Sequence, residues 1–430
     1  MNIQMLWDFS KIPVNQAFTS RLLVTVETPR KTGRPRRPLN VAVVLDRSGS
    51  MSGAKLQRVK EATRILVEKL GPEDIFSLTV FDTVVTPLVA PMPVRDGGHS
   101  IARTIEAIHA GSSTNLSGGY LQGCDFARRN NSPERINRVI LLSDGLANEG
   151  ITHPQELARL AQAHRRENLT TSTIGVGSDF NEELMGKMAE QGGGSTYFID
   201  RPEEANSVFL EELGDLKAVA ATGFQIRFAP SLPGVQAAQL NNYGQPAADV
   251  YYLGDILEGI PKHLVLEVKL PPARQEGRVE IGRLEFLFHE AVETGFQGRR
   301  EEFPVELDVV ALDEFASIIP VREVTLQAAY LTVAAVKAES IRLSDQGHFQ
   351  EAAAVLENCA NTLREMQLHD PRLDRMIQEL FDSARQLRER GEQYYTPRQR
   401  KQMYFEAELT QKSQTAKADR MRQRQGRPED

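Results

Sequence analysis

The sequence predicts a protein of mixed class, in which an α/β domain with a doubly wound, mostly parallel sheet accompanies a β-sandwich domain and a C-terminal helical region. Three observations indicate this architecture. Residues 39–219 alternate between apolar runs of strand length and segments with apolar residues at helical spacing. Residues 220–320 contain short β-like runs separated by glycine and proline, which is typical of an antiparallel sandwich. From residue 321 the chain has the pattern of successive helices.

Two continuous apolar runs mark the centre of the α/β sheet. They are NVAVVLD and RVILLSDG, and each has the character of a strand buried on both faces. Further strands are predicted at DIFSLTVFD, TTSTIGVG and STYFID, and helices at residues 53–70, 118–130, 154–168, 181–191 and 203–217. Because strands alternate with helices, we expect parallel strands with helices on both faces of the sheet.

The N-terminal segment TSRLLVTVETP is also strand-like, and the basic linker RKTGRPRRP separates it from the α/β region. A lone strand there has no sheet of its own, so we expect it to join the sandwich, which makes the α/β domain an insertion within a β-domain. The alternative is an edge strand of the α/β sheet. The predicted parts are an N-terminal strand segment at 1–38, the α/β domain at 39–219, the β-sandwich at 220–320, and a helical region with a polar tail at 321–430.

The C-terminal region begins with two helical segments that are separated at Gly347, and together they predict an α-hairpin. The pair is similar to one tetratricopeptide unit, but no second copy follows at a fixed period. Two further helices are predicted at 371–391 and 397–420. The last residues are polar, and their lysine and arginine side chains could contact an acidic partner or face solvent.

Composition limits the classes of function. A net charge of −7 gives no overall case for nucleic-acid binding, and no run reaches the roughly 18 apolar residues of a membrane span. The two cysteines, Cys124 and Cys359, lie far apart in the sequence and indicate no disulfide framework. The N-terminus lacks the pattern of a signal peptide. We therefore expect a cytoplasmic protein.

Oxygen-bearing side chains gather at the predicted carboxyl ends of strands, where open α/β sheets bind ligands. The motif LDRSGS contains Asp46, Ser48 and Ser50. Thr114 lies in GSSTNL before a predicted helix, and Asp144 lies in LLSDG after the second buried strand. Carboxylates and hydroxyls without histidine or cysteine favour a hard cation such as Mg²⁺. These five residues can supply part of its shell and leave one position open.

These motifs resemble those of the von Willebrand factor A family. D-x-S-x-S at 46–50, Thr114 in STN and Asp144 in SDG match the three parts of that family's metal-ion-dependent adhesion site. The resemblance covers roughly residues 39–219 and implies a Rossmann-like fold. It also implies that Ser48 and Ser50 bind the metal directly, and that Thr114, Asp46 and Asp144 bind directly or through water. The metal it implies is Mg²⁺ foremost, with Mn²⁺ and Ca²⁺ as alternatives.

The same resemblance implies a function for the site. In the family the open metal position typically accepts a carboxylate from a protein partner. The architecture is similar to that of intracellular bacterial members, which work beside AAA+ ATPases of the chelatase or MoxR type or in signalling assemblies. The segment MSGAKLQ after the motif lacks the acidic residues of a second cation site, so we predict one metal ion.

Other interpretations of the same residues remain open. Aspartate and serine at a strand-to-helix junction commonly cap helices, and Ser52 could serve in that way. Arg47, the only cation inside the motif, is expected to point away from the ligands. No phosphate-binding loop, hydrolase elbow or zinc spacing is present in the sequence.

Three functions follow from these interpretations. The first is a metal-dependent adaptor or scaffold that binds protein and is not an enzyme. The second is a Mg²⁺-dependent phosphohydrolase that uses Asp46 or Asp144 as nucleophile or base. The third is a structural protein whose metal only holds the loops together.

Overall fold

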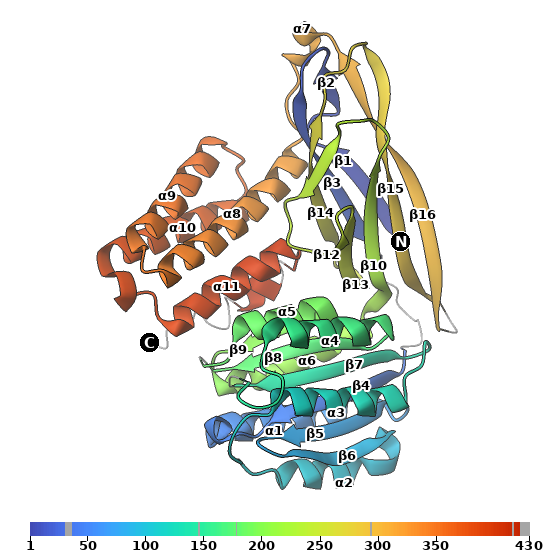
Figure 1. The fold of residues 1–430 in the computed structure, drawn as a ribbon, viewed down its shortest axis with the longest axis vertical. Helices are drawn as coiled ribbons and strands as arrows, with labels where there is room; N and C mark the ends of the chain where they lie inside the picture. The colour runs from blue at the N-terminus through green and yellow to red at the C-terminus, as the bar shows by residue number, and fades with distance from the viewer. Residues whose placement is uncertain (31–36, 145–146, 178, 293–294, 415–416, 422–430) are drawn as a thin grey trace. The chain divides into compact units, whose positions relative to one another are not determined.

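The protein is seen here in a computed structural model that describes residues 1–30, 37–144, 147–177, 179–292, 295–414 and 417–421. The chain divides into two compact units, which are described separately (Figure 1). Unit 1 comprises Met1–Arg30, Phe224–Phe288 and Arg299–Asp430. Unit 2 comprises Lys31–Gly223 and His289–Gly298.

Unit 2 is built on a six-stranded sheet with the order β6-β5-β4-β7-β8-β9. Its strands are β4 (Leu39–Asp46), β5 (Ile75–Phe81), β6 (Val85–Pro93), β7 (Ile136–Ser143), β8 (Thr170–Val176) and β9 (Gly193–Ile199). Only β6 runs antiparallel to its neighbour, and β4 and β7 are buried along their whole length. The predicted fold class, an α/β domain with a mostly parallel sheet, is confirmed.

In the described part of unit 2, the helices that cover this sheet are α1 (Ala54–Lys69), α2 (Val94–Glu106), α3 (Leu116–Arg129), α4 (Pro154–Arg166), α5 (Glu182–Gly192) and α6 (Ala205–Lys217). Helix α1 packs against α2 and α6, whereas α4 packs against α5 and is joined to α3 by a hydrogen bond between Arg128 and His164. The chain leaves β4 toward β5 on one side and later returns to β7 on the other. Because such crossovers are right-handed, the two groups of helices lie on opposite faces.

The sequence assigned no element to β6 and α2. Strand β6 contains Pro87, Pro91 and Pro93, which are tolerated because it lies at the sheet edge. Helix α2 contains Gly97 and Gly98, which disfavour helix in the isolated chain. Both elements therefore depend on packing against the sheet more than on local preference.

Two further sheets consist of strands that lie wholly or mostly in unit 1. The first has the order β1-β3-β14-β11 and consists of β1 (Asn2–Trp7), β3 (Phe18–Glu27), β14 (Lys262–Leu270) and β11 (Gln236–Gln239). The second has the order β12-β13-β10-β15-β16-β2 and consists of β12 (Gly244–Ala247), β13 (Val250–Leu257), β10 (Val219–Pro230), β15 (Gly277–Val292), β16 (Gly295–Val310) and β2 (Lys11–Pro13). The Trp7 indole donates to the Glu306 carbonyl at 3.0 Å, which links the two sheets.

The N-terminal strand β3 lies inside the first sheet. It pairs antiparallel with β14 from Phe18, opposite Leu270, to Val26, opposite Lys262. The strand is apolar on both faces because Leu23 packs under helix α8, while Leu22 points to the opposite face of the sheet.

The helical part of unit 1 contains the short α7 (Leu312–Phe315) and four longer helices, α8 (Arg322–Asp345), α9 (Phe349–Glu365), α10 (Pro371–Arg390) and α11 (Pro397–Gln411). Helices α8 and α9 form the predicted hairpin, which turns at Gly347 with φ +80°. Helix α11 ends at Gln411 and not at the predicted residue 420. Among the described residues, no helix is both long enough and apolar enough to cross a bilayer.

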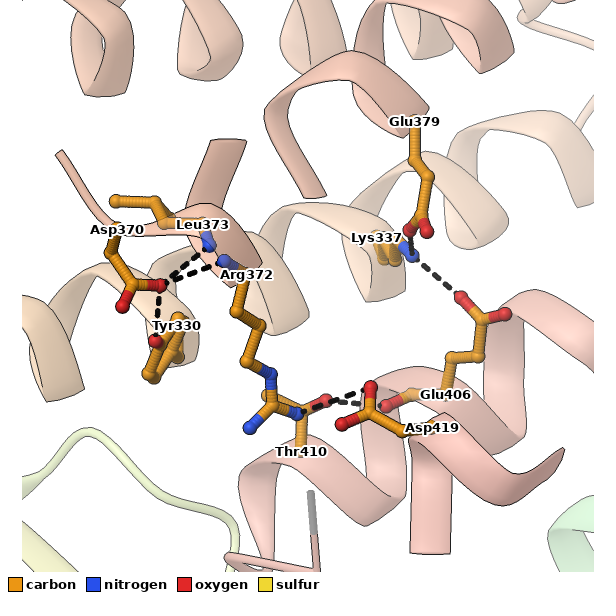
Figure 2. Close-up of polar contacts among 9 residues, drawn as sticks. All are labelled: Tyr330, Lys337, Asp370, Arg372, Leu373, Glu379, Glu406, Thr410 and Asp419. Atoms are coloured by element: carbon orange, nitrogen blue, oxygen red, sulfur yellow. Dashed lines mark hydrogen bonds and ion pairs between the residues drawn. The ribbon is translucent and has the colours of Figure 1, made fainter. Parts of the chain in front are cut away.

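Polar side chains tie three of these helices together (Figure 2). The ammonium of Lys337 on α8 lies 2.7 Å from Glu406 on α11 and 3.4 Å from Glu379 on α10. Asp370 caps α10 and also accepts a hydrogen bond from Tyr330 on α8 at 2.7 Å. Val324 and Leu331 of α8 also pack against Leu23 and Val265 of the first sheet, so α8 takes part in a second hydrophobic cluster that joins it to that sheet.

Candidate metal centre

The predicted site residues Asp46, Ser48, Ser50 and Asp144 lie at the carboxyl ends of β4 and β7, which are neighbours in the sheet, and Thr114 lies in the loop before α3. Connections leave these two strands in opposite directions, which makes this edge the switch point where open α/β sheets bind ligands. Asp46 is the last residue of β4, and Asp144 follows directly after β7. The fold therefore brings the two predicted carboxylates to the same edge.

Asp46 organises the loop that follows β4. Its carboxylate is fully buried and accepts hydrogen bonds from the Ser48 backbone N–H at 2.8 Å and from the Ser143 hydroxyl at 2.6 Å. Burial raises the pKa of the Asp46 carboxyl above its ordinary value, while the hydrogen bonds from Ser143 and Ser48 act in the opposite direction. Since both oxygens are engaged, Asp46 orients the loop and Ser143 links it to β7. Sequence reasoning missed Ser143, although it directly precedes the predicted Asp144.

Three oxygen donors form a continuous chain at this edge. The hydroxyl oxygens of Ser48 and Ser50 are 3.1 Å apart, and the Ser50 hydroxyl donates to Asp144 Oδ1 at 2.7 Å. Helix α1 takes Gly53 as its N-cap residue and has no side-chain cap, so the capping role considered for Ser52 is wrong. The serines of the motif thus contact one another and Asp144, and none of them caps α1.

The loop of Thr114 is fastened to both other loops. Gly49 donates its backbone N–H to the Ser112 carbonyl at 2.9 Å, and the Thr114 carbonyl accepts from Asn148 at 3.1 Å. The Thr114 side chain itself is buried. A side chain at Gly111 would collide with the carboxylate of Asp82, so glycine is required for this close approach. The structure therefore assembles all three predicted segments at one place.

Arg47 does not face the oxygen donors. Its guanidinium pairs with Asp82 at 3.0 Å and donates to the Thr86 hydroxyl at 3.3 Å. Asp82 follows β5, on the far side of β4 from Asp144. The expected outward direction of Arg47 thus has a structural cause, which is an ion pair with the neighbouring strand end.

Lys55 is a second site residue that sequence reasoning missed. Its ammonium nitrogen lies 2.6 Å from Asp144 Oδ2 and 4.0 Å from Asp179 Oδ2. The Asp144 side chain is 0% exposed and that of Lys55 is 25% exposed. The sequence feature that could have indicated this contact is the position of Lys55 in the first turn of the helix that follows the motif. Sequence reasoning considered this segment only for its lack of acidic residues.

The donor set fits a hard cation on geometric grounds. Mg²⁺ in octahedral coordination holds oxygens at about 2.1 Å, which places adjacent ligands about 3 Å apart. The hydroxyl oxygens of Ser48 and Ser50 are 3.1 Å apart, and the Ser50 hydroxyl lies 2.7 Å from Asp144 Oδ1. Both distances are close to the separation expected between adjacent ligands of one such ion. Within the described residues there is no group of three or more His, Cys, Asp or Glu side chains that could hold a metal. The oxygens gathered at this edge are those of hydroxyls and of the two carboxylates.

The fold and these loops define a class of protein, namely a doubly wound α/β domain that gathers oxygen-bearing side chains at the switch point of its sheet. Residues 40–213 match the family model of the von Willebrand factor type A domain. This part of the chain is therefore a von Willebrand factor type A (VWA) domain, as the motifs indicated.

Two curated relatives are similar over much of the chain. The uncharacterized protein sll0103 of Synechocystis sp. is 25% identical over 339 residues, which cover 76% of this chain and 79% of that protein. The uncharacterized protein YfbK of Escherichia coli is 28% identical over 260 residues, which cover 56% of this chain and 43% of that protein. The match thus spans most of the first relative and less than half of the second.

Solved structures resemble the whole architecture. A von Willebrand factor type A protein from Catenulispora acidiphila superposes with a TM-score of 0.65 at 16% identity and covers 86% of this chain and 90% of its own. The ArnB paralog VWA2 from Sulfolobus acidocaldarius gives a TM-score of 0.63 at 18% identity and covers 96% and 97%. At these identities the likeness shows the fold, and it includes the strand-rich and helical parts beside the VWA domain.

Proposed function

We propose that the VWA domain is a metal-dependent protein-binding module that takes up a divalent cation, Mg²⁺ foremost, and through it an acidic side chain of a partner protein. VWA domains typically mediate protein–protein interactions. The observation that carries the proposal is the chain of oxygens from Ser48 through Ser50 to Asp144, spaced as ligands of one ion. Asp46 and Thr114 complete the set, directly or through water.

The donor chemistry explains why such an ion would attract a partner. Ser48, Ser50 and Thr114 are neutral ligands, so the ion keeps more of its positive charge than it would among several carboxylates. An incoming carboxylate then gains a strong electrostatic attraction at the open position. The site would therefore select acidic side chains and lose its affinity when the metal is removed.

We extend the proposal to an adaptor whose sandwich and helices offer further docking surfaces. An AAA+ ATPase or a signalling component is the proposed partner class, and a cytoplasmic setting is proposed as well. The two cysteines, Cys124 and Cys359, are both free thiols, as is usual in a reducing compartment.

A capture experiment tests this function. The tagged full chain is incubated with extract of its native cell in Mg²⁺ or in EDTA, and bound proteins are identified by mass spectrometry. We expect one set of partners to be lost both in EDTA and with Ser50→Ala, and to be kept with Ser52→Ala, which changes an exposed serine of the same loop. Capture that is unchanged in EDTA and with Ser50→Ala would sink the proposal.

A Mg²⁺-dependent phosphohydrolase is the second candidate, because Lys55 supplies a cation beside Asp144 that could steady a phosphate. Asp46 is poorly suited as the nucleophile, since it is buried and both of its oxygens accept hydrogen bonds. Hydrolysis of p-nitrophenyl phosphate with Mg²⁺ separates the two functions. Turnover by the natural chain that is lost with Ser50→Ala would favour the enzyme. We expect no turnover by the natural chain.

A purely structural metal is separated from the binding module by competition. Any ligand selective for the native state stabilises it, so metal-dependent melting cannot distinguish these roles. An acidic peptide that displaces the captured partner in Mg²⁺ supports the binding module. Capture that such a peptide leaves unchanged favours the structural role.

A further inference from the structure

We propose that Lys55 is a built-in competitor of the metal ion: its ammonium group and the divalent cation exclude each other at Asp144, so that Lys55 sets the affinity of the site. The contact between Lys55 Nζ and Asp144 Oδ2 at 2.6 Å carries this inference. It rests on the proposed function, since it assumes that the cation binds at these residues.

The competition follows from the position of Asp144. Its carboxylate is fully buried, with Oδ1 bonded to the Ser50 hydroxyl and Oδ2 bonded to Lys55. A buried carboxylate without a counter-charge is strongly unfavourable, so the ammonium stabilises the loops while no metal is bound. Once a divalent ion uses Asp144, two cations would lie within a few ångströms and repel each other. Binding of the metal therefore requires Lys55 to move away.

The surroundings of Lys55 allow this movement. Its side chain is 25% exposed, and a second carboxylate, Asp179, lies 4.0 Å from the same nitrogen with 72% of its side chain exposed. Gly177 borders the path with φ +76°, and a Cβ there would lie 3.1 Å from both Cε and Nζ of Lys55. The ammonium can thus pass from Asp144 to Asp179 while it stays at the edge of the site.

Lys60, a second lysine of the same helix, provides a comparison, because its ammonium group is held in place by backbone carbonyls. Lys60 on α1 is buried and donates to the backbone carbonyls of Glu106 and Ile108, at 2.6 and 3.3 Å. Those acceptors belong to the fold and do not bind cations in the proposed site. Lys55 differs because its acceptor, Asp144, is a predicted metal ligand.

Removal of the competitor should strengthen metal binding. We expect Lys55→Met, which keeps most of the aliphatic stem, to bind Mn²⁺ about 10-fold more tightly than the natural chain, in the range of ordinary couplings between two ligands. The free Mn²⁺ signal in electron paramagnetic resonance reports the affinity of the full chain. The matched control is Arg58→Met, which removes one positive charge from the next turn of α1 without a contact to Asp144.

Three outcomes of the titration decide the inference. A clear gain with Lys55→Met and little change with Arg58→Met supports it. If the natural chain binds Mn²⁺, Ser50→Ala does not, and Lys55→Met equals the natural chain, the competition is overturned while the proposed metal site stands. If Ser50→Ala binds Mn²⁺ as well as the natural chain does, or if no form binds it, the proposed site fails and the inference falls with it.

A measurement on the natural chain avoids any doubt about the folding of a variant. Lysine acylation by an amine-reactive ester is read out peptide by peptide with and without Mn²⁺. We expect the modification of Lys55 to rise when Mn²⁺ releases it from Asp144, while the modification of Lys60 stays low in both states. Modification of Lys55 that is unchanged or reduced by saturating Mn²⁺ would contradict the competition.

Discussion

Two lysine–carboxylate pairs of nearly equal length lie in the two units of this protein. In unit 2, Lys55 is 2.6 Å from Asp144, and in unit 1, Lys337 is 2.7 Å from Glu406. The Lys337 side chain is 6% exposed and that of Glu406 is 8% exposed, whereas the Lys55 side chain is 25% exposed. The pairs therefore differ in what surrounds them and not in their own geometry.

The surroundings separate a fixed pair from an exchangeable one. Lys337 lies between helices, with Glu379 of α10 as its second acceptor and Glu406 of α11 as its first, so it joins three helices (Figure 2). Lys55 contacts one oxygen of Asp144, whose other oxygen accepts from the Ser50 hydroxyl, and these oxygens belong to the proposed metal site. The length of an ion pair thus does not indicate its role. The neighbouring polar groups and the solvent exposure of the side chains distinguish the two pairs.

The largest expected effect comes from breaking the fixed pair. Lys337→Met leaves the buried Glu406 carboxylate without this ammonium, and breaking a buried pair in this way typically costs about 3–5 kcal/mol. Trp7, the only tryptophan of the chain, lies in β1 of unit 1 and reports its unfolding by fluorescence in urea. Since α8 shares a core with the first sheet, we expect the Trp7 transition to shift to lower urea.

Two companion variants sharpen this result. The double variant Lys337→Met with Glu406→Met removes both charges, and we expect it to regain much of the lost stability, because apolar replacements of buried pairs are often neutral. Lys55→Met changes the other pair and should leave the Trp7 transition in place. A Trp7 transition that Lys337→Met does not move would show that this pair contributes little to unit 1.

A partly buried histidine of unit 1, His263, extends the comparison to a group whose positive charge is disfavoured. Burial lowers the pKa of His263 on β14 to about 4. In the unfolded chain its pKa is about 6.5, so the unfolded state binds more protons as the pH falls. The stability of unit 1 should therefore be unaffected by this group above about pH 6.5 and should decline below it, by about 3 kcal/mol at pH 4.

Urea unfolding followed through Trp7 at several pH values measures this decline. His263→Gln is the control, since it keeps a polar group that can meet the Thr25 hydroxyl, which lies 3.0 Å from the His263 ring. The difference between the natural chain and the variant isolates His263 from the carboxylates that titrate in the same range. Equal pH dependence in both would show that His263 is accessible to protons in the folded state.

The centre of the fold was predictable because its signals are local. The apolar runs of β4 and β7 are typical of strands buried on both faces, and the carboxyl ends of two such strands predict that Asp46 and Asp144 lie close together. The predicted helices of unit 2 agree with the observed ones to within two residues at most ends. Strand β6 and helix α2 were missed, since their prolines and glycines oppose the structure that packing imposes.

The parts of the site that were missed depend on distances across the fold. Lys55 is nine residues from Asp46 but contacts Asp144, 89 residues away, and no periodicity reports such a contact. Arg47 was expected to point outward, yet its partner Asp82 could not be named from the sequence. A sequence motif thus identifies candidate ligands, whereas the charged partners of those ligands emerge only from the packed strand ends.

Addition of metal should separate the two lysine pairs without any mutation. A ligand selective for the native state at 100 times its Kd stabilises that state by about 2.7 kcal/mol. With saturating Mg²⁺ we expect slower hydrogen exchange in unit 2, strongest in peptides from Asp46 to Lys55, and unchanged exchange in helices α8 and α11. The sulfate salt of Na⁺ at equal ionic strength is the control. Equal protection of α8 and α11 would mean that the effect of Mg²⁺ is general and not tied to the site.

The smallest expected effect concerns the polar contacts next to the fixed pair. Asp370 Oδ1 accepts from the backbone N–H groups of Arg372 and Leu373, at 3.0 and 2.8 Å, and from the Tyr330 hydroxyl at 2.7 Å. Loss of a helix cap costs about 1 kcal/mol, so Asp370→Ala should lower the free energy of unfolding of unit 1 by about 1–2 kcal/mol when the Tyr330 bond is included.

Two milder variants divide this cost between the cap and the tyrosine. Asp370→Asn keeps an oxygen for the cap and a partner for Tyr330, so we expect little loss in the Trp7 transition. Tyr330→Phe removes one hydrogen bond and keeps the cap, and it should fall between the other two. A loss with Asp370→Asn as large as that with Asp370→Ala would mean that the charge of Asp370 matters more than its cap. In that case the helices of unit 1 would depend on charge in the same way as the strand ends of unit 2, and the contrast between the two regions would narrow.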